Sequence, residues 1–160
     1  METETFAHGP ETRWRFVADS VMGGVSTGQL AFQQEAGQSH ARLTGRVSTA
    51  NNGGFIQMRM AVTEPLPDGI TGVRLVVRGN DQRYFVHLRT TAAIRPTHYY
   101  QAGFEAAERW QEVRLPFSAF TASTPLLAPV PVAASLTAIG IVAFGRDHDA
   151  DIAIRELGFF

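Results

Sequence analysis

The sequence predicts an all-β protein, built as an antiparallel two-sheet sandwich or jelly roll. Apolar and polar residues alternate with a period of two along many short segments, while helical periodicity is scarce. Most of these segments are separated by clusters of Gly, Pro, Asn and Asp, the residues that favour tight turns. A chain of 160 residues has the size of one domain, so we expect residues 1–160 to form a single β-sandwich domain.

The alternating segments give about ten expected strands. In chain order they are 13–17, 29–34, 40–48, 56–60, 73–78, 84–89, 97–104, 110–115, 136–144 and 152–155. A single helical turn is expected at 117–120, directly after Pro116. Residues 121–134 contain three prolines and form the one long irregular connection. We expect Trp14 and Trp110 to anchor the core, because a buried tryptophan contributes a large apolar area.

Composition excludes several classes of function. The chain has no cysteine and no lysine, which excludes disulfides, thiolate catalysis, a Schiff-base lysine and a phosphate-loop lysine. A net charge of −1 gives no general attraction to nucleic acid. No apolar run reaches the length of a membrane span, and the first residues lack a signal or transit pattern. We therefore expect no membrane span, no nucleic-acid partner and a cytoplasmic location.

Residues 24–28 read G-V-S-T-G and match the turn that carries a hydrolase nucleophile. That turn needs a strand before the serine and a helix after it, whereas the residues after Gly28 alternate as a strand does. The glycine spacing is also that of a phosphate loop, but the required Lys and Ser/Thr are missing after Gly28. We expect instead a tight glycine turn, in which Gly23 and Gly24 adopt positive φ. "NNGG" at 51–54 repeats this chemistry, and Gly23 and Gly53 are both expected to resist substitution.

Two motifs in this order carry a family resemblance: "DSVMGGVS" at 19–26 and "NNGGF" at 51–55. They stand between Trp14 and the later segments "GVRLVVRGNDQRY" (72–84), "WQEVRLPFSAF" (110–120) and "IGIVAFG" (139–145). Over its whole length the chain resembles the complex I intermediate-associated protein 30 family. The resemblance implies a galactose-binding-like jelly roll and a non-enzymatic assembly factor or chaperone. Together with the missing transit pattern, it suggests a short bacterial-type member whose client need not be complex I.

Two groups of residues are candidates for binding. At the loop end they are Asp19, Ser20, Asn51 and Asn52, although Asp19 and Asn51 could instead brace the glycine turns internally. On a sheet face they are Arg59, Arg78, Tyr84, His87, Arg89 and Tyr100, because arginine forks and aromatic rings favour binding faces. An ordinary solvated sheet face is the competing interpretation.

No metal, cofactor or catalytic residue is expected. Asp147, Asp149 and Asp151 fail the calcium-loop pattern and are expected to lie in a solvated hairpin turn, and the five histidines show no zinc spacing. The sequence thus predicts a rigid sandwich that binds a protein partner, and an assembly intermediate is the partner it favours. A carbohydrate-binding module, or a domain that binds another small or anionic ligand, is the alternative, and an enzyme that uses Ser26 is a second rival.

Overall fold

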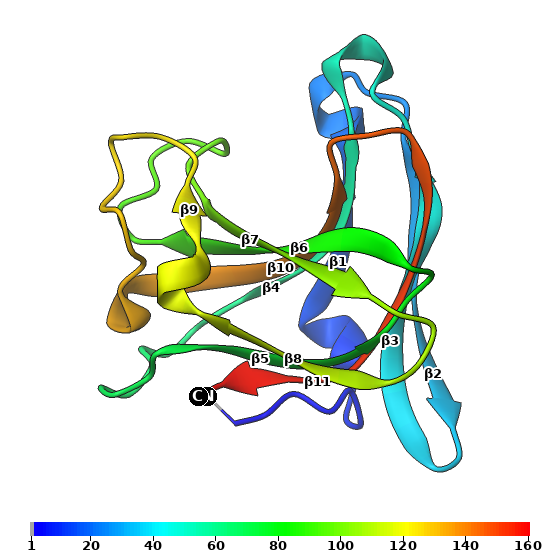
Figure 1. The fold of residues 1–160 in the computed structure, drawn as a ribbon, viewed down its shortest axis with the longest axis horizontal. Helices are drawn as coiled ribbons and strands as arrows, with labels where there is room; N and C mark the ends of the chain where they lie inside the picture. Colours follow the sequence, from blue (N-terminus) through cyan, green and yellow to red (C-terminus); the bar gives the residue numbers. More distant parts are fainter. Residues whose placement is uncertain (1) are drawn as a thin grey trace.

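The computed structural model describes residues 2–160 and contains two antiparallel sheets stacked as a sandwich (Figure 1). The six-stranded sheet has the order β1 (Trp14–Ala18), β4 (Phe55–Ala61), β10 (Leu136–Phe144), β6 (Gln82–Thr90), β7 (Tyr100–Ala106), β9 (Thr121–Ala122). The five-stranded sheet has the order β2 (Thr27–Glu35), β3 (Gln38–Val47), β11 (His148–Phe159), β5 (Gly72–Arg78), β8 (Gln111–Pro116). The predicted all-β sandwich is therefore confirmed.

Short 3-10 turns connect some of these strands. They are η1 (Pro10–Thr12), η2 (Asp19–Met22), η3 (Ala50–Asn52), η4 (Phe117–Ala119) and η5 (Ala133–Ser135). The expected helical turn after Pro116 is η4. No helix in residues 2–160 is long and apolar enough to cross a bilayer.

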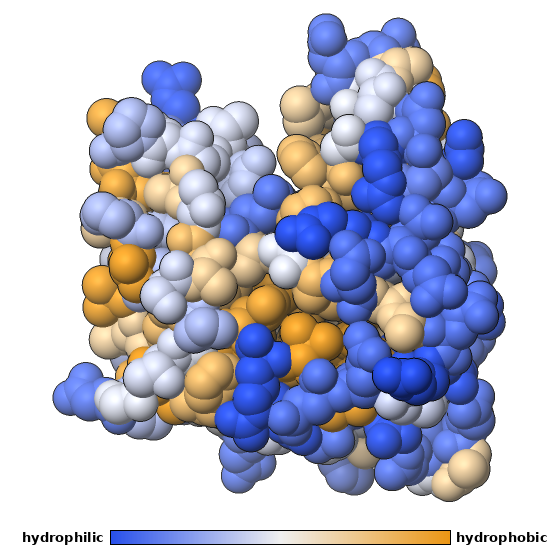
Figure 2. All heavy atoms as spheres, in the orientation of Figure 1, coloured by the Kyte–Doolittle hydropathy of each residue, from blue (hydrophilic) through white to orange (hydrophobic). Residues whose placement is uncertain are grey.

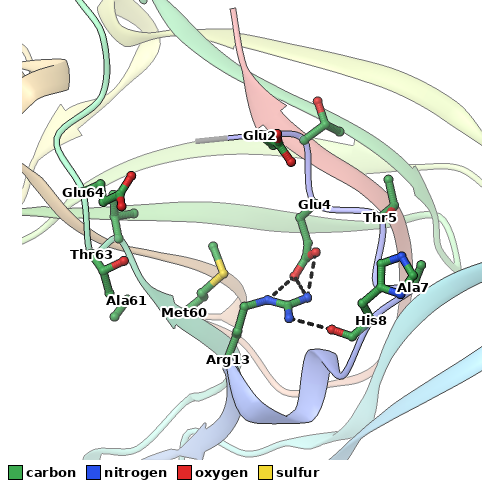
Figure 3. A pocket seen from close by; sticks show the side chains of 12 residues that line it. Glu2, Glu4, Thr5, Ala7, His8, Arg13, Met60, Ala61, Thr63 and Glu64 are labelled. Atoms are coloured by element: carbon green, nitrogen blue, oxygen red, sulfur yellow. Dashed lines mark hydrogen bonds and ion pairs between the residues drawn. The ribbon is translucent and has the colours of Figure 1, made fainter.

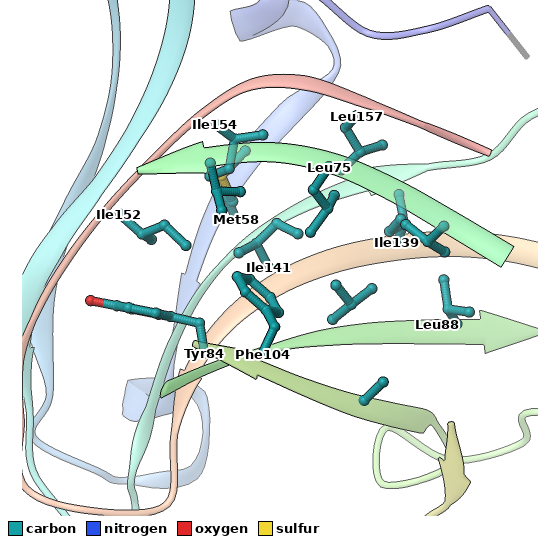
Figure 4. Packing of buried hydrophobic residues seen from close by; sticks show 14 of the residues in the cluster. Met58, Leu75, Tyr84, Leu88, Phe104, Ile139, Ile141, Ile152, Ile154 and Leu157 are labelled. Carbon is teal, nitrogen blue, oxygen red and sulfur yellow. The ribbon is translucent and has the colours of Figure 1, made fainter. Parts of the chain in front are cut away.

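The core fills the space between the two sheets, as the alternation requires (Figure 4). Met58, Leu75, Ile141 and Ile154 have essentially no exposed surface, and they come from strands of both sheets. Trp14 is buried as expected, and its Nε1 donates to Glu4 Oε1 at 2.8 Å.

Three expectations about single elements were wrong. Trp110 lies half-buried between two cations, with the Arg78 and Arg155 guanidinium groups 4.7 and 4.8 Å from its ring centre. The strand expected at 97–104 begins only at Tyr100, because residues 91–99 fold into a loop closed by His98 N–H on the Arg95 carbonyl. Asp149 and Asp151 lie on β11 rather than in a turn.

Candidate functional site

The two glycine motifs meet around one buried carboxylate, that of Asp19, which has no exposed surface. Its Oδ1 accepts the Ser26 backbone N–H at 3.0 Å. Its Oδ2 accepts the Ser26 hydroxyl at 2.5 Å and the Gly54 and Phe55 N–H groups at 2.7 and 3.3 Å. Burial raises the pKa of Asp19, but these hydrogen bonds outweigh it and hold the pKa below its usual range. We call this arrangement the Asp19 clamp. It holds residues 19–26 against residues 48–55.

Asp19 was proposed as a contact residue, and the clamp gives it the other expected role, that of an internal brace. Ser26 completes the same network. Its hydroxyl donates to Asp19 and accepts the Ser48 N–H at 2.9 Å, and its hydrogen-bond partners in residues 2–160 include no histidine. The residues before it form η2 and those after it form β2. The G-V-S-T-G stretch therefore lacks the strand-serine-helix geometry of a nucleophile turn.

The glycines are needed for two different reasons. Gly23 has φ of +85°, as expected, and a Cβ there would meet nothing within 4 Å. Gly24 does not have positive φ, contrary to expectation, and neither does Gly53. A Cβ at either would lie 2.4 Å from an atom of the Asp19 carboxyl group, so these two glycines make room for the clamp.

The outer surface of these loops carries the remaining loop-end candidates. Ser20, Asn51 and Asn52 are exposed, and both asparagines have positive φ, 57° and 60°. Val21 and Met22 are also exposed, at 74% and 59%. Residues 19–26 and 48–54, called here the glycine lobe, form the tallest part of the molecule in Figure 1.

A second lobe faces the glycine lobe across a notch (Figure 2). This proline lobe consists of residues 91–99 and 121–135, which are joined by the Ser123 N–H on the Tyr99 carbonyl at 2.8 Å. It too exposes large apolar side chains, among them Ile94 at 79% and Leu126 at 76%. Figure 1 places the six-stranded sheet beneath the notch, so the outer face of that sheet is its floor. We call this notch the groove.

Strand register defines the floor of the groove. One cross-strand row runs Arg15, Arg59, Gly140, His87, Gln101. The next row runs Val17, Gln57, Val142, Phe85, Gly103. Gly140 has no side chain in the first row, and the Gln57 amide occupies that space, since a Cβ at Gly140 would lie 2.7 Å from Gln57 Oε1.

Aromatic rings cover the middle of the floor. His87 stacks on Tyr99 with ring centres 4.2 Å apart, and its Nε2 hydrogen-bonds Gln101 Oε1 at 2.7 Å. Phe144 packs edge-on against both His87 and Phe85, with ring centres 5.9 Å apart in each pair. Burial lowers the pKa of His87 to about 4, despite the Gln101 hydrogen bond, which raises it. The imidazole is therefore neutral at pH 7 and adds no charge to the floor.

Acid should destabilise the protein partly through His87. Its pKa is about 6.5 when unfolded and about 4 when folded, so the folded state resists protonation. On account of His87, the free energy of unfolding is highest above pH 6.5 and falls by roughly 3 kcal/mol as the pH drops to 4. Urea unfolding at pH 7, 5.5 and 4 should show a smaller loss for His87→Gln than for the wild type. His40 and His148, whose pKa values burial also lowers, remain in both proteins. If the free energies of unfolding of His87→Gln and the wild type fall equally with pH, His87 does not contribute to the acid sensitivity.

The structure divides the six sheet-face candidates. Arg59, His87 and Arg89 do share the outer face of the six-stranded sheet. Tyr84 and Tyr100 were wrongly placed there. Both point into the core, and their hydroxyls hydrogen-bond to Asn80 and to the Ala128 carbonyl. Burial raises the pKa of Tyr84 to about 12.

Arg78 was also expected on this face, but it belongs to the opposite sheet. There it pairs with Glu35 at 3.0 Å and lies over the Trp110 ring. Sequence reasoning also missed Arg15, Tyr99 and Phe144. Arg15 follows buried Trp14, so the alternation of strand residues already directs it outward. Tyr99 and Phe144 reach the groove through loop geometry and strand pairing, which no local pattern shows.

A separate cavity of about 400 Å³ lies between the first residues and the end of β4 (Figure 3). Its most buried acid, Glu4, is bound by Arg13 at 2.8 Å and by the Trp14 indole. Burial raises the pKa of Glu4, but the hydrogen bonds from Trp14, Arg13 and Phe6 hold it below its usual range. Glu4 is thus already occupied in fixing the segment before β1.

The predicted acidic turn near residues 147–151 is also occupied by protein contacts. Asp147 accepts the Thr49 N–H at 2.7 Å, which ties the glycine lobe to the β10–β11 turn. Asp149 and Asp151 pair with Arg46 and Arg42 across β3. No group of three or more His, Cys, Asp or Glu side chains in the described part of the chain is arranged to hold a metal ion.

A family model for complex I intermediate-associated protein 30 matches residues 5–149, a stretch that includes both glycine motifs and the groove. The chain belongs to this family. No curated protein matches its sequence.

Solved structures with low sequence identity share the fold. The family 11 carbohydrate-binding module from Clostridium thermocellum, in complex with a β-1,3-1,4-mixed-linked tetrasaccharide, has a TM-score of 0.77 at 8% identity, covering 99% of this chain and 94% of that chain. An exo-β-agarase has a TM-score of 0.66 at 6% identity, covering 100% of this chain and 25% of that chain. A family 30 carbohydrate-binding module has a TM-score of 0.57 at 11% identity, covering 81% and 73%. These similarities confirm the two-sheet jelly-roll fold.

Proposed function

We propose that this member of the complex I intermediate-associated protein 30 family is a non-enzymatic assembly factor that holds a protein partner in the groove. The family membership supports a role in protein assembly. The observation that carries the proposal is the groove itself. Two lobes that expose Met22 and Ile94 flank a rigid sheet floor with aromatic and arginine side chains. Exposed apolar side chains beside arginine and aromatic groups are typical of protein interfaces.

Rigidity supports this role as well. The Asp19 clamp fixes the glycine lobe, and hydrogen bonds of Ser123 and of the Tyr100 hydroxyl fix the proline lobe. A preformed groove loses little conformational entropy when a partner binds, so even a modest apolar contact gives useful affinity. In this proposal Ser20, Asn51 and Asn52 contact the partner at the lobe surface, and Arg59, His87 and Arg89 do so on the floor.

The test is capture from lysate of the source cells, followed by titration calorimetry with the purified captured protein. The Met22→Ser/Ile94→Ser double variant alters one exposed apolar residue on each lobe and should weaken binding by about tenfold or more. Arg46→Ala, an exposed change on the five-stranded sheet, is the matched control. Equal affinity for the double variant and the wild type would contradict a groove interface.

Carbohydrate binding is the second candidate. The similar solved structures include carbohydrate-binding modules, and the rings of Tyr99, His87 and Phe144 form an aromatic floor. Aromatic faces in a groove are suitable for stacking against sugar rings. Titration with a β-1,3-1,4-mixed-linked glucan tetrasaccharide distinguishes the two functions. A binding heat with the tetrasaccharide that is lost in Tyr99→Ala would favour the carbohydrate function. No binding heat with the tetrasaccharide, together with binding of the captured protein, would favour the assembly role.

A further inference from the structure

One part of the groove has a distinct electrostatic character. A cleft of about 320 Å³ lies where the sheet floor meets the proline lobe. Its lining residues are Arg59, Arg89, Thr90, Ala93, Ile94, Arg95, Pro96 and Thr137. Three of these eight residues are arginines and none is acidic, so no carboxylate in the lining compensates the three positive charges.

Arg59 and Arg95 are the arginines of this cleft whose guanidinium groups have no protein partner in the described part of the chain, and of the two only Arg59 is partly buried. The Arg59 guanidinium makes no hydrogen bond or ion pair within residues 2–160, although it is only partly exposed. Seven other arginines of the chain do pair with carboxylates: Arg13, Arg42, Arg46, Arg74, Arg78, Arg83 and Arg114. Burial lowers the pKa of Arg59, and the charge of Arg15, its cross-strand neighbour, lowers it further.

The neighbouring Arg89 orders the cleft without neutralising it. Its guanidinium donates to the backbone carbonyls of Arg95, Pro96 and His98, which holds the loop at 91–99 against the sheet. Carbonyl acceptors carry no net charge, so the positive charge of Arg89 remains. Burial lowers the pKa of Arg89, and so does the charge of Arg59, as expected for two like charges that line one cleft.

We propose that this cleft binds carboxylates of an acidic segment of the protein partner, with Arg59 as the main anion-binding residue. The inference rests on the proposed function and specifies the chemistry of the partner. An incoming carboxylate would relieve the repulsion between Arg59 and its arginine neighbours and would supply the paired acceptors that a guanidinium fork matches. Arg15, along the same row, extends the positive stripe beyond the cleft.

The surroundings favour a polypeptide over a longer polyanion. Ile94, itself a cleft residue, is 79% exposed and offers an apolar contact beside the charges. The chain as a whole carries a net charge of −1, so attraction to an extended nucleic acid is not expected. A segment that alternates acidic and apolar residues matches both features.

The experiment measures fluorescence anisotropy with a labelled peptide of alternating glutamate and leucine, and with its glutamine counterpart. The wild type should bind the glutamate peptide at least about tenfold more tightly than the glutamine peptide, and added salt should weaken this preference. Arg59→Gln should remove most of the preference. Arg114→Gln, on the five-stranded sheet, should keep it. Arg59→Glu should reverse the preference toward a peptide of alternating lysine and leucine.

Three results would overturn the inference. They are equal binding of the glutamate and glutamine peptides by the wild type, an unchanged preference in Arg59→Gln, and equally tight binding of single-stranded DNA of the same length. Failure of the inference remains distinguishable from failure of the proposed function. If the captured partner still binds Arg59→Gln fully but loses affinity for Met22→Ser/Ile94→Ser, the groove interface stands and the acidic segment does not.

Discussion

Asp19→Ala is expected to lower the free energy of unfolding by about 5 kcal/mol, the largest effect of any single change considered for this chain. The carboxylate accepts four hydrogen bonds in a site with no exposed surface. Each donor left buried without a partner costs about 1–3 kcal/mol. Asp19→Asn should also destabilise, by about 3 kcal/mol, because its amide N–H₂ must face donors rather than acceptors. Urea unfolding monitored by tryptophan fluorescence measures both values.

Ser20→Ala is the matched control for Asp19. It changes the next residue, which is exposed, and should alter stability by no more than about 0.5 kcal/mol. The clamp also predicts its own pH window. Because folding lowers the pKa of Asp19, its contribution is complete above the unfolded pKa near 3.9 and is lost as the pH falls below that value. If Asp19→Asn unfolds at the same urea concentration as the wild type, the clamp does not stabilise the fold.

Gly53→Ala and Gly24→Ala are expected to lower the free energy of unfolding by about 4 kcal/mol each. A Cβ at either position would lie 2.4 Å from an atom of the Asp19 carboxyl group, so the new methyl group must displace the carboxylate and break its hydrogen bonds. The effect arises from the lost clamp rather than from backbone strain, because neither glycine has positive φ. Thermal and urea unfolding of the purified variants provide the measurement.

Gly23→Ala separates the two roles of glycine within the same motif. Gly23 has φ of +85° and open space around it, so alanine there should cost only about 1 kcal/mol of backbone strain. A ranking in which Gly23→Ala destabilises as strongly as Gly24→Ala would refute the steric explanation.

The sequence was sufficient to predict most of the strands and which side of most of them faces the core, although β9 lies in the segment 121–134 that was expected to be irregular. Tyr84 shows why the candidate site was only partly predicted. It lies in phase with Val86 and Leu88, so its alternation already indicated burial, and its aromatic character was given too much weight. Arg78 was misplaced for another reason. Its outward direction was correct, but the sheet to which β5 belongs depends on pairing with β11 and β8, far along the chain.

The groove depends on the same long-range information. Arg15 and Arg59 become neighbours only when β1 pairs with β4, and Arg59 and His87 face each other only across Gly140 of β10. Local periodicity gives the direction of each side chain but not the order of strands. The Asp19 clamp was partly foreseen, because paired glycines after polar residues indicate tight loops. The contact between the two glycines and one carboxylate required the folded structure.

The strand order has a consequence for biosynthesis. β10 and β11, the last two strands of this chain, occupy interior places in the two sheets, with β10 between β4 and β6 and β11 between β3 and β5. Neither sheet can therefore close until residues 136–159 have left the ribosome. Before that moment the nascent chain exposes unpaired strand edges, and pairing across such long separations is slow. During synthesis the unfinished sheets are therefore open to incorrect strand pairing.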